Sequence, residues 1–190
     1  MSSTPRDARS CCAAMPAADR TRLRALHRAL GIPATYRAQR RLPWQPEARR
    51  LVSIGRAADD GQPVRLAPRA AAAWRRMHAA AARDGVDLLP LSGFRSVARQ
   101  AGIIREKLAA GQSLAAILRL VAAPGCSEHH TGRAVDVGSA GAAELDETFA
   151  RTAAFRWLQQ HARRFGFRLS YPRKNVHGIA YEPWHWCWHA

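Results

Sequence analysis

The sequence is poor in acidic residues and in lysine. Only 14 of its 190 residues are Asp or Glu, against 30 Lys or Arg, so the formal net charge is +16. Lys107 and Lys174 are its only lysines, and arginine carries the rest of the positive charge. This excess favours attraction to polyanions such as nucleic acid, anionic membranes or anionic cell-wall polymers, without identifying one of them.

Long apolar runs and a cysteine framework are also lacking. No run of about eighteen apolar residues occurs, which excludes a transmembrane helix, and residues 1–20 lack the apolar centre of a secretory signal. The four cysteines do not have the spacing of a small disulfide scaffold. The sequence does not exclude a disulfide between Cys126 and Cys187. Hydrophobic residues make up 47% of the chain, enough for a sizeable core.

The apolar pattern predicts helices first, with short strands between them. We expect a disordered tail over 1–15, and we divide the chain into an N-terminal extension (1–40) and a second domain (41–190). This layout is typical of an α+β fold with a small antiparallel sheet and N-terminal helices packed around it. The pattern predicts helices over 16–31, 66–84, 97–111, 113–123 and 147–164, a linker or wrapping arm over 32–48, and strands over 86–92, 134–137, 167–171 and 177–182.

Two histidines and an aspartate form the strongest candidate for a metal site. Catalytic zinc takes three ligands from His, Asp and Glu and leaves one position for water, and His129, Asp136 and His185 provide such a set. On the expected strand, Val135 and Val137 face one side and Asp136 the other. A carboxylate that faces inward from a buried strand is costly unless it is paired or metal-bound.

Glu182 is the candidate general base beside this set. On a regular strand Glu182 and His185 would point to opposite faces, but Pro183 between them favours a bend that turns both to one site. A glutamate next to an activated water can take its proton and pass it to the leaving amine.

Three sequence blocks carry a family resemblance. SGFRS at 92–96, SEHHTGRAVD at 127–136 and YEPWH at 181–185 resemble, in order and spacing, the signature blocks of the VanY-type D-alanyl-D-alanine carboxypeptidases. The resemblance covers about residues 50–186. It implies the fold of the hedgehog and D-Ala-D-Ala peptidases, shared with the VanX dipeptidases and the peptidoglycan L,D-carboxypeptidases. The family usually continues after the last ligand with an Arg-Tyr pair, whereas this chain has Trp186-Cys187-Trp188.

The resemblance also implies the roles of individual residues. It makes His129, Asp136 and His185 the ligands of one Zn²⁺ per chain and Glu182 the catalytic base. It gives Arg95 the role of stabilising the oxyanion, which suits a guanidinium that stays charged. The positions that match substrate contacts are Ser127, Gln100 and Tyr171.

We therefore expect a zinc carboxypeptidase that removes the C-terminal D-alanine of peptidoglycan-type peptides. Its expected partners are the peptidoglycan stem peptide or its fragments and, through the basic surface, an anionic wall polymer. The sequence leaves the compartment open, because no signal segment is seen but the substrate belongs to the envelope.

Other interpretations remain beside this one. An endopeptidase of the same fold is the first alternative. A non-catalytic polyanion-binding protein is less favoured, because no helix-turn-helix, RNP or zinc-finger signature points to a specific nucleic acid. We expect His130 to be a loop histidine. A structural zinc site of Cys126, Cys187, His129 and His189 is disfavoured because no CxxC pair is present.

Overall fold

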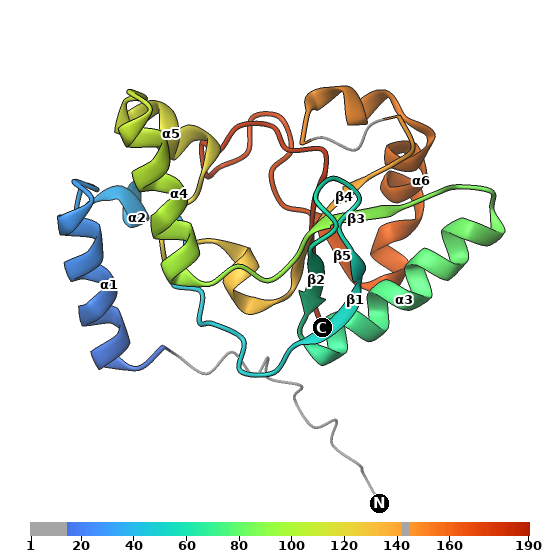
Figure 1. Ribbon diagram of the computed structural model, residues 1–190, viewed down its shortest axis with the longest axis horizontal. Helices are drawn as coiled ribbons and strands as arrows, with labels where there is room; N and C mark the ends of the chain where they lie inside the picture. Colours follow the sequence, from blue (N-terminus) through green and yellow to red (C-terminus); the bar gives the residue numbers. More distant parts are fainter. Residues whose placement is uncertain (1–14, 142–144) are drawn as a thin grey trace, which may run out of the picture.

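The computed structural model describes residues 15–141 and 145–190 (Figure 1). The segment predicted as a disordered tail lies outside these residues, apart from Met15. The pair Cys11 and Cys12 lies outside them as well. The fold is α+β, as expected. The helices are α1 (Ala17–Ala29), α2 (Tyr36–Gln39), α3 (Pro68–Arg83), α4 (Val97–Ala109), α5 (Leu114–Leu120) and α6 (Ala153–His161), with 3-10 turns η1 (Glu128–Thr131), η2 (Glu147–Arg151) and η3 (Ala162–Phe165).

Two antiparallel sheets form the β part of the fold. The smaller one pairs β1 (Val52–Arg56) with β2 (Pro63–Leu66). The larger one has the order β3-β4-β6-β5, made by β3 (Leu89–Ser92), β4 (Ala134–Gly138), β6 (His185–Trp188) and β5 (Phe167–Leu169). Its register sets Asp136 on β4 opposite both Ser92 on β3 and His185 on β6, so residues distant in sequence meet in one row across the sheet.

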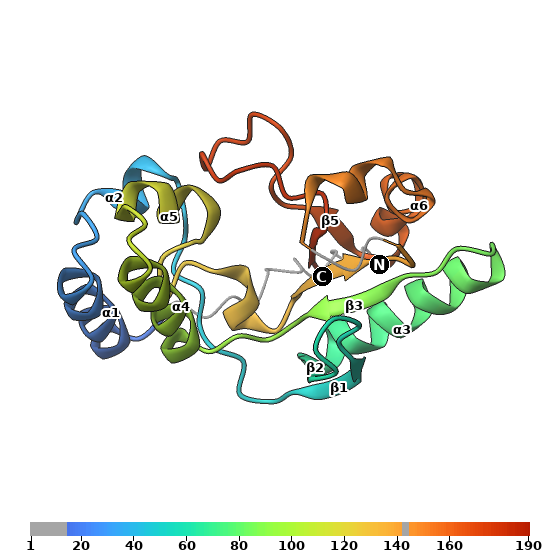
Figure 2. The same ribbon diagram turned by 45° about the horizontal axis from the view of Figure 1, so that its top comes forward.

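The core consists of two separate groups of buried side chains. Figures 1 and 2 show α1, α4 and α5 together on one side of the molecule and α3, α6 and the sheets on the other. We call the two groups the helical cluster and the sheet cluster. The helical cluster contains Leu30, Ile32, Tyr36, Leu42, Ala101, Ile104, Ile117, Leu118, Ala123 and Cys126. The sheet cluster includes Leu66, Trp74, Met77, Leu88, Val135, Val137, Phe149, Phe155, Leu158, Phe167 and Trp186.

Local sequence signals explain where several helices begin. Pro68 occupies the first turn of α3, where its missing N–H costs no hydrogen bond. The Ser96 hydroxyl accepts a hydrogen bond from the Arg99 N–H (3.1 Å) and caps α4, as the sequence predicts. None of the helices in the described ranges combines the length and the apolarity that a bilayer crossing requires.

The strand predicted over 177–182 is wrong. This segment has no strand, and the last strand of the large sheet is β6, which begins only at His185. The Asn175 side chain explains the difference, because its amide donates to the carbonyls of Pro172 (3.0 Å) and Ile179 (2.7 Å) and its oxygen accepts from the His177 N–H (3.1 Å). These bonds satisfy backbone groups within the loop, so they hold it out of a ladder.

Two other segments differ from the expected pattern. The single helix predicted over 147–164 is interrupted at Thr152, which has extended backbone angles and caps α6 by accepting from the Phe155 N–H. The segment 32–48 contains the short helix α2 and buries Tyr36 in the helical cluster, so it packs more closely than a linker. The division of the chain at residue 40 stays a prediction.

Candidate metal centre and catalytic cleft

One cleft of about 480 Å³ contains every residue that the sequence marks as a site residue. They come from all three sequence blocks and from α4 and the loop after β5. The eight are Arg95, Gln100, Ser127, His129, Asp136, Tyr171, Glu182 and His185. Such convergence of polar groups in one hollow is what a catalytic site requires.

Three buried donors meet at the floor of this cleft. Oδ2 of Asp136 lies 3.2 Å from Nε2 of His129, and Oδ1 lies 3.0 Å from Nδ1 of His185. One donor atom from each residue lies within 4.8 Å of the others, so the three can hold a metal ion. Two imidazoles and a carboxylate are ligands that zinc prefers. The donor set therefore fits zinc, with further positions open towards the cleft.

The peptide backbone aims His129 into the centre. Its Nδ1 donates to the Gly93 carbonyl (2.6 Å), which directs Nε2 towards Asp136. Gly93 is required at this position, since a Cβ there would lie 2.5 Å from the Arg65 carbonyl oxygen. Gly132 ends η1 with a φ of +63°, where a side chain would be strained.

The electrostatics of the centre favour a positive charge. Burial alone would raise the pKa of Asp136, but the neighbouring His129 and His185 outweigh it and lower that pKa far below its usual range. Burial alone would lower the pKa of His185, but Asp136 and Glu128 raise it to about 10. A cation between these carboxylates is therefore stabilised, as a metal site requires.

Glu182 faces the same centre from a turn. The His185 N–H donates to the Glu182 carbonyl (3.1 Å), and this turn around Pro183 brings the Glu182 carboxylate within 3.9 Å of His185 Nδ1. The bend predicted from the sequence is thus present. Burial raises the pKa of Glu182 to about 7, with the Asp136 charge adding to the rise and His185 and Arg95 opposing it.

Arg95 lies half-buried at the side of the cleft and is held there. Its guanidinium donates to Ser92 Oγ (3.2 Å) and to Gln100 Oε1 (3.3 Å), and it lies 3.8 Å from Asp136 Oδ2. Gln100 is itself fixed, since its amide donates to the Ala122 carbonyl (2.6 Å). The charge of Arg95 is therefore fixed beside the centre.

The other two predicted substrate contacts have less defined surroundings. Ser127 is buried at the start of η1, and the Tyr171 ring lies 4.9 Å from the His185 ring. The backbone carbonyl of Tyr171 accepts from the Glu182 N–H (3.1 Å), so Tyr171 also helps to place the turn. Both side chains line the cleft, and their contact with substrate stays a prediction.

Sequence reasoning missed the role of Glu128. Its Oε2 accepts from His185 Nε2 (3.0 Å) and from Ser170 Oγ (2.6 Å), so Glu128 orients the imidazole from behind. Burial opposes its ionisation, but His185 and Ser170 lower its pKa to about 2. Its position beside His129 was visible in the sequence, but its partner on β6 was not.

His130 and the cysteines have structural surroundings. His130 is fully buried; its Nδ1 donates to the Arg95 carbonyl (2.6 Å) and its Nε2 accepts from the Gly125 N–H (3.0 Å). Cys126 and Cys187 are buried and free, so the structure does not contain the Cys126–Cys187 disulfide that the sequence did not exclude. In the described ranges Cys126 joins no group of metal donors, which removes the disfavoured four-residue zinc site.

The comparisons with known proteins converge on one family. The family model described as VanY, D-alanyl-D-alanine carboxypeptidase, matches residues 63–190. A D-alanyl-D-alanine carboxypeptidase of Enterococcus faecalis is 35% identical over 117 residues, which is 56% of this chain and 42% of that protein. The chain therefore spans less than half the length of this curated relative.

Two solved structures share the fold. The LdcB LD-carboxypeptidase superposes with a TM-score of 0.67 at 33% identity, over 77% of this chain and 71% of that one. A mutant of the vancomycin-resistance D,D-pentapeptidase VanY, solved in complex with Zn(II), has a TM-score of 0.58 at 30% identity, over 77% and 82% of the two chains.

Proposed function

The chain belongs to the VanY D-alanyl-D-alanine carboxypeptidase family, whose model spans more than half of it, and on that premise we propose its reaction. We propose that it is a zinc-dependent carboxypeptidase that hydrolyses the bond to the C-terminal D-alanine of peptidoglycan-type peptides. The observation that carries the proposal is the buried His129, Asp136 and His185 group, which lies in one cleft with Glu182 and Arg95.

We assign the zinc ion to the three buried donors, one catalytic ion per chain. Their types fit zinc, and the solved VanY relative holds Zn(II). When bound, the ion polarises the scissile carbonyl and makes water acidic enough to attack near neutral pH. Glu128 orients His185 by accepting from its Nε2, which leaves Nδ1 directed towards the centre.

Glu182 moves the proton in this reaction. Its carboxylate accepts a proton from the attacking water, and the resulting carboxylic acid donates it to the nitrogen of the leaving D-alanine. In the metal-free chain burial raises the pKa of this carboxyl group to about 7, which favours its use as both a base and an acid near neutral pH. The balance is simple: water is consumed, one C–N bond breaks, and a carboxylate and an amine are released.

Arg95 stabilises the negative charge that develops on the carbonyl oxygen. Ser92 and Gln100 hold its guanidinium, so little reorganisation is needed when that charge appears. Gln100, Ser127 and Tyr171 line the cleft around it and are our proposed contacts for the peptide and its terminal carboxylate. We also propose that the arginine-rich surface draws the chain to anionic wall polymer.

A peptide assay tests the proposal and separates it from the endopeptidase alternative. The zinc-loaded chain is incubated with a stem peptide that ends in D-Ala-D-Ala and with the same peptide blocked as its C-terminal amide. Mass spectrometry should show loss of one D-alanine from the free peptide and much slower cleavage of the amide. A third peptide, with an L-residue before the last D-alanine, separates D,D from L,D specificity.

The control is the variant Glu182→Gln, which keeps the shape of the side chain. Equal cleavage of free and blocked peptides, or cuts inside the stem, would show that the chain is an endopeptidase and not a carboxypeptidase. If the zinc-loaded chain cleaves none of these peptides, the proposed activity is wrong.

A further inference from the structure

Strand β6 presents a row of metal-binding side chains that continues past the catalytic centre. Alternate residues of a strand share a face, so Cys187 lies on the same face as His185, and His189 continues that row just after the strand. Trp186 and Trp188 point the other way, and both pack with the sheet cluster. The role proposed for the chain in hydrolysis uses only His185 from this row.

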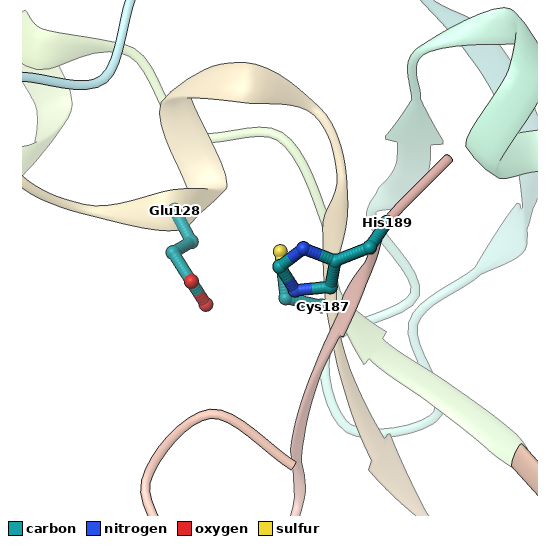
Figure 3. Close-up of side chains that lie close together, drawn as sticks. All are labelled: Glu128, Cys187 and His189. Atoms are coloured by element: carbon teal, nitrogen blue, oxygen red, sulfur yellow. The ribbon is translucent and has the colours of Figure 1, made fainter. Parts of the chain in front are cut away.

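Cys187 and His189 meet Glu128 beyond the catalytic centre. One donor atom from each of the three residues lies within 4.8 Å of the others, and Figure 3 shows the three side chains gathered between η1 and the end of β6. Cys187 is almost fully buried, whereas His189 is exposed. The group is therefore closed on one side and open to solvent on the other.

We propose that Glu128, Cys187 and His189 form a second site for a divalent cation of the zinc type. A thiolate, an imidazole and a carboxylate are together characteristic of zinc and related borderline metals, rather than of Mg²⁺ or Ca²⁺, which select oxygen ligands. Solvent on the His189 side provides the remaining position. Binding releases the thiol proton of Cys187 to water, because the ligand form of cysteine is the thiolate.

Neighbouring groups hold the Glu128 carboxylate and the backbone of His189. Both hydrogen bonds to Glu128, from His185 and from Ser170, fall on Oε2, which leaves Oε1 as the oxygen available to a cation. The His189 N–H donates to the Gly166 carbonyl (2.8 Å), which fixes the backbone at that residue. The site therefore needs only small side-chain movements to close around an ion.

The charges near the site also suit a cation once the thiol has ionised. Burial is the main cause that lowers the pKa of His189; the Glu128 charge opposes this shift, and Arg133 and Arg168 add to it. The Cys187 thiolate and the Glu128 carboxylate supply two negative charges against them. A divalent ion and these two anionic ligands are neutral together, so the occupied site adds no net charge to that of the arginines.

This site is distinct from the substrate cleft but linked to the catalytic centre. In the described part of the chain, neither Glu128, Cys187 nor His189 belongs to the lining of the cleft. Glu128 is the link, because the same carboxylate orients His185. An ion on Glu128 draws electron density from the oxygen that His185 contacts, so occupancy of the second site should alter the metal affinity of the first.

Cobalt(II) is the probe that distinguishes the two sites. The catalytic donors contain no sulfur, so only ligation by a cysteine produces an intense thiolate-to-cobalt charge-transfer band in the near ultraviolet. The parent protein for the experiment carries Cys11→Ser and Cys12→Ser, which leaves Cys126 and Cys187 as its thiols. Metal-free parent is titrated with Co²⁺, and absorption and bound metal are recorded.

We expect two bound ions and a thiolate band in the parent, one ion and no band after Cys187→Ser, and a weakened band after His189→Ala. Cys126→Ser is the matched control and should keep the band, because Cys126 lies in the helical cluster. His189 is exposed, so its variant tests the site even if Cys187→Ser does not fold.

Two results would overturn the proposal: one bound ion without a thiolate band in the parent, or a band that survives Cys187→Ser. Peptide hydrolysis by the protein loaded with one ion is measured separately. The absence of the second site would leave that activity intact, so failure here is distinct from failure of the proposed reaction.

Discussion

The buried His130 should make the fold acid-sensitive in a measurable way. Its neutral ring donates from Nδ1 to the Arg95 carbonyl and accepts at Nε2 from the Gly125 N–H. Protonation would place a second N–H against the Gly125 donor and put a charge in a fully buried position. Burial is the main cause that lowers the pKa of His130, from 6.5 to about 4.

The loss of stability and the pH window in which it occurs both follow from this shift in the pKa of His130. The unfolded chain binds the proton near pH 6.5, whereas the folded chain binds it only near pH 4, so stability is complete above pH 6.5 and falls as the pH drops towards 4. Each pKa unit corresponds to ~1.4 kcal/mol. Because the unfolded chain binds this proton more tightly, acidification should lower the free energy of unfolding by about 2 kcal/mol between pH 7 and pH 5. The loss should reach about 3 kcal/mol by pH 4.

Urea unfolding of the metal-free chain measures this effect. The control is His130→Gln, which can keep one of the two hydrogen bonds but cannot titrate. The variant should be less stable at pH 7, by about 1–3 kcal/mol for the polar group left without a partner. Between pH 7 and pH 5, however, it should lose about 2 kcal/mol less than the parent. Equal losses in the two proteins would refute the assignment of the acid sensitivity to His130.

Three further substitutions test the proposed chemistry and the frame of the site. Glu182→Gln should abolish hydrolysis while metal analysis still finds zinc; loss of the ion would show that Glu182 is a ligand rather than the base. Arg95→Ala should lower kcat by roughly 10²–10³-fold with a smaller change in KM, and a change in KM alone would assign Arg95 to ground-state binding. Gly93→Ala should lower both Tm and zinc affinity, because its Cβ would collide with the Arg65 carbonyl and displace the acceptor of His129. Unchanged calorimetry and metal titrations of that variant would contradict this reasoning.

Local signals made part of the fold predictable. Pro68 and Ser96 mark helix starts by their own chemistry, and the apolar spacing of Trp74 and Met77 marks the buried face of α3. The strand at Asp136 was predictable because β-branched neighbours surround a single carboxylate. In each case the information lies within a few residues of the element that it determines.

The remaining features depend on long-range pairing. The last strand was predicted too early, because nothing near it in the sequence shows that pairing with β4 and β5 begins only at His185. The three sequence blocks indicated which side chains belong together, and the cleft indeed gathers them. The contact between Glu128 and His185 could not be read from either segment alone, since it depends on how η1 lies against β6.

The two separate cores have a consequence for how such a cleft diversifies. The metal donors stand on or against the large sheet, whereas Ile103, Leu120 and Val121, which also line the cleft, come from the side of α4 and α5. Because the two walls rest on different packing, substitutions in one need not disturb the other. Selection can therefore vary the wall built by α4 and α5 while the metal donors at the large sheet stay constant.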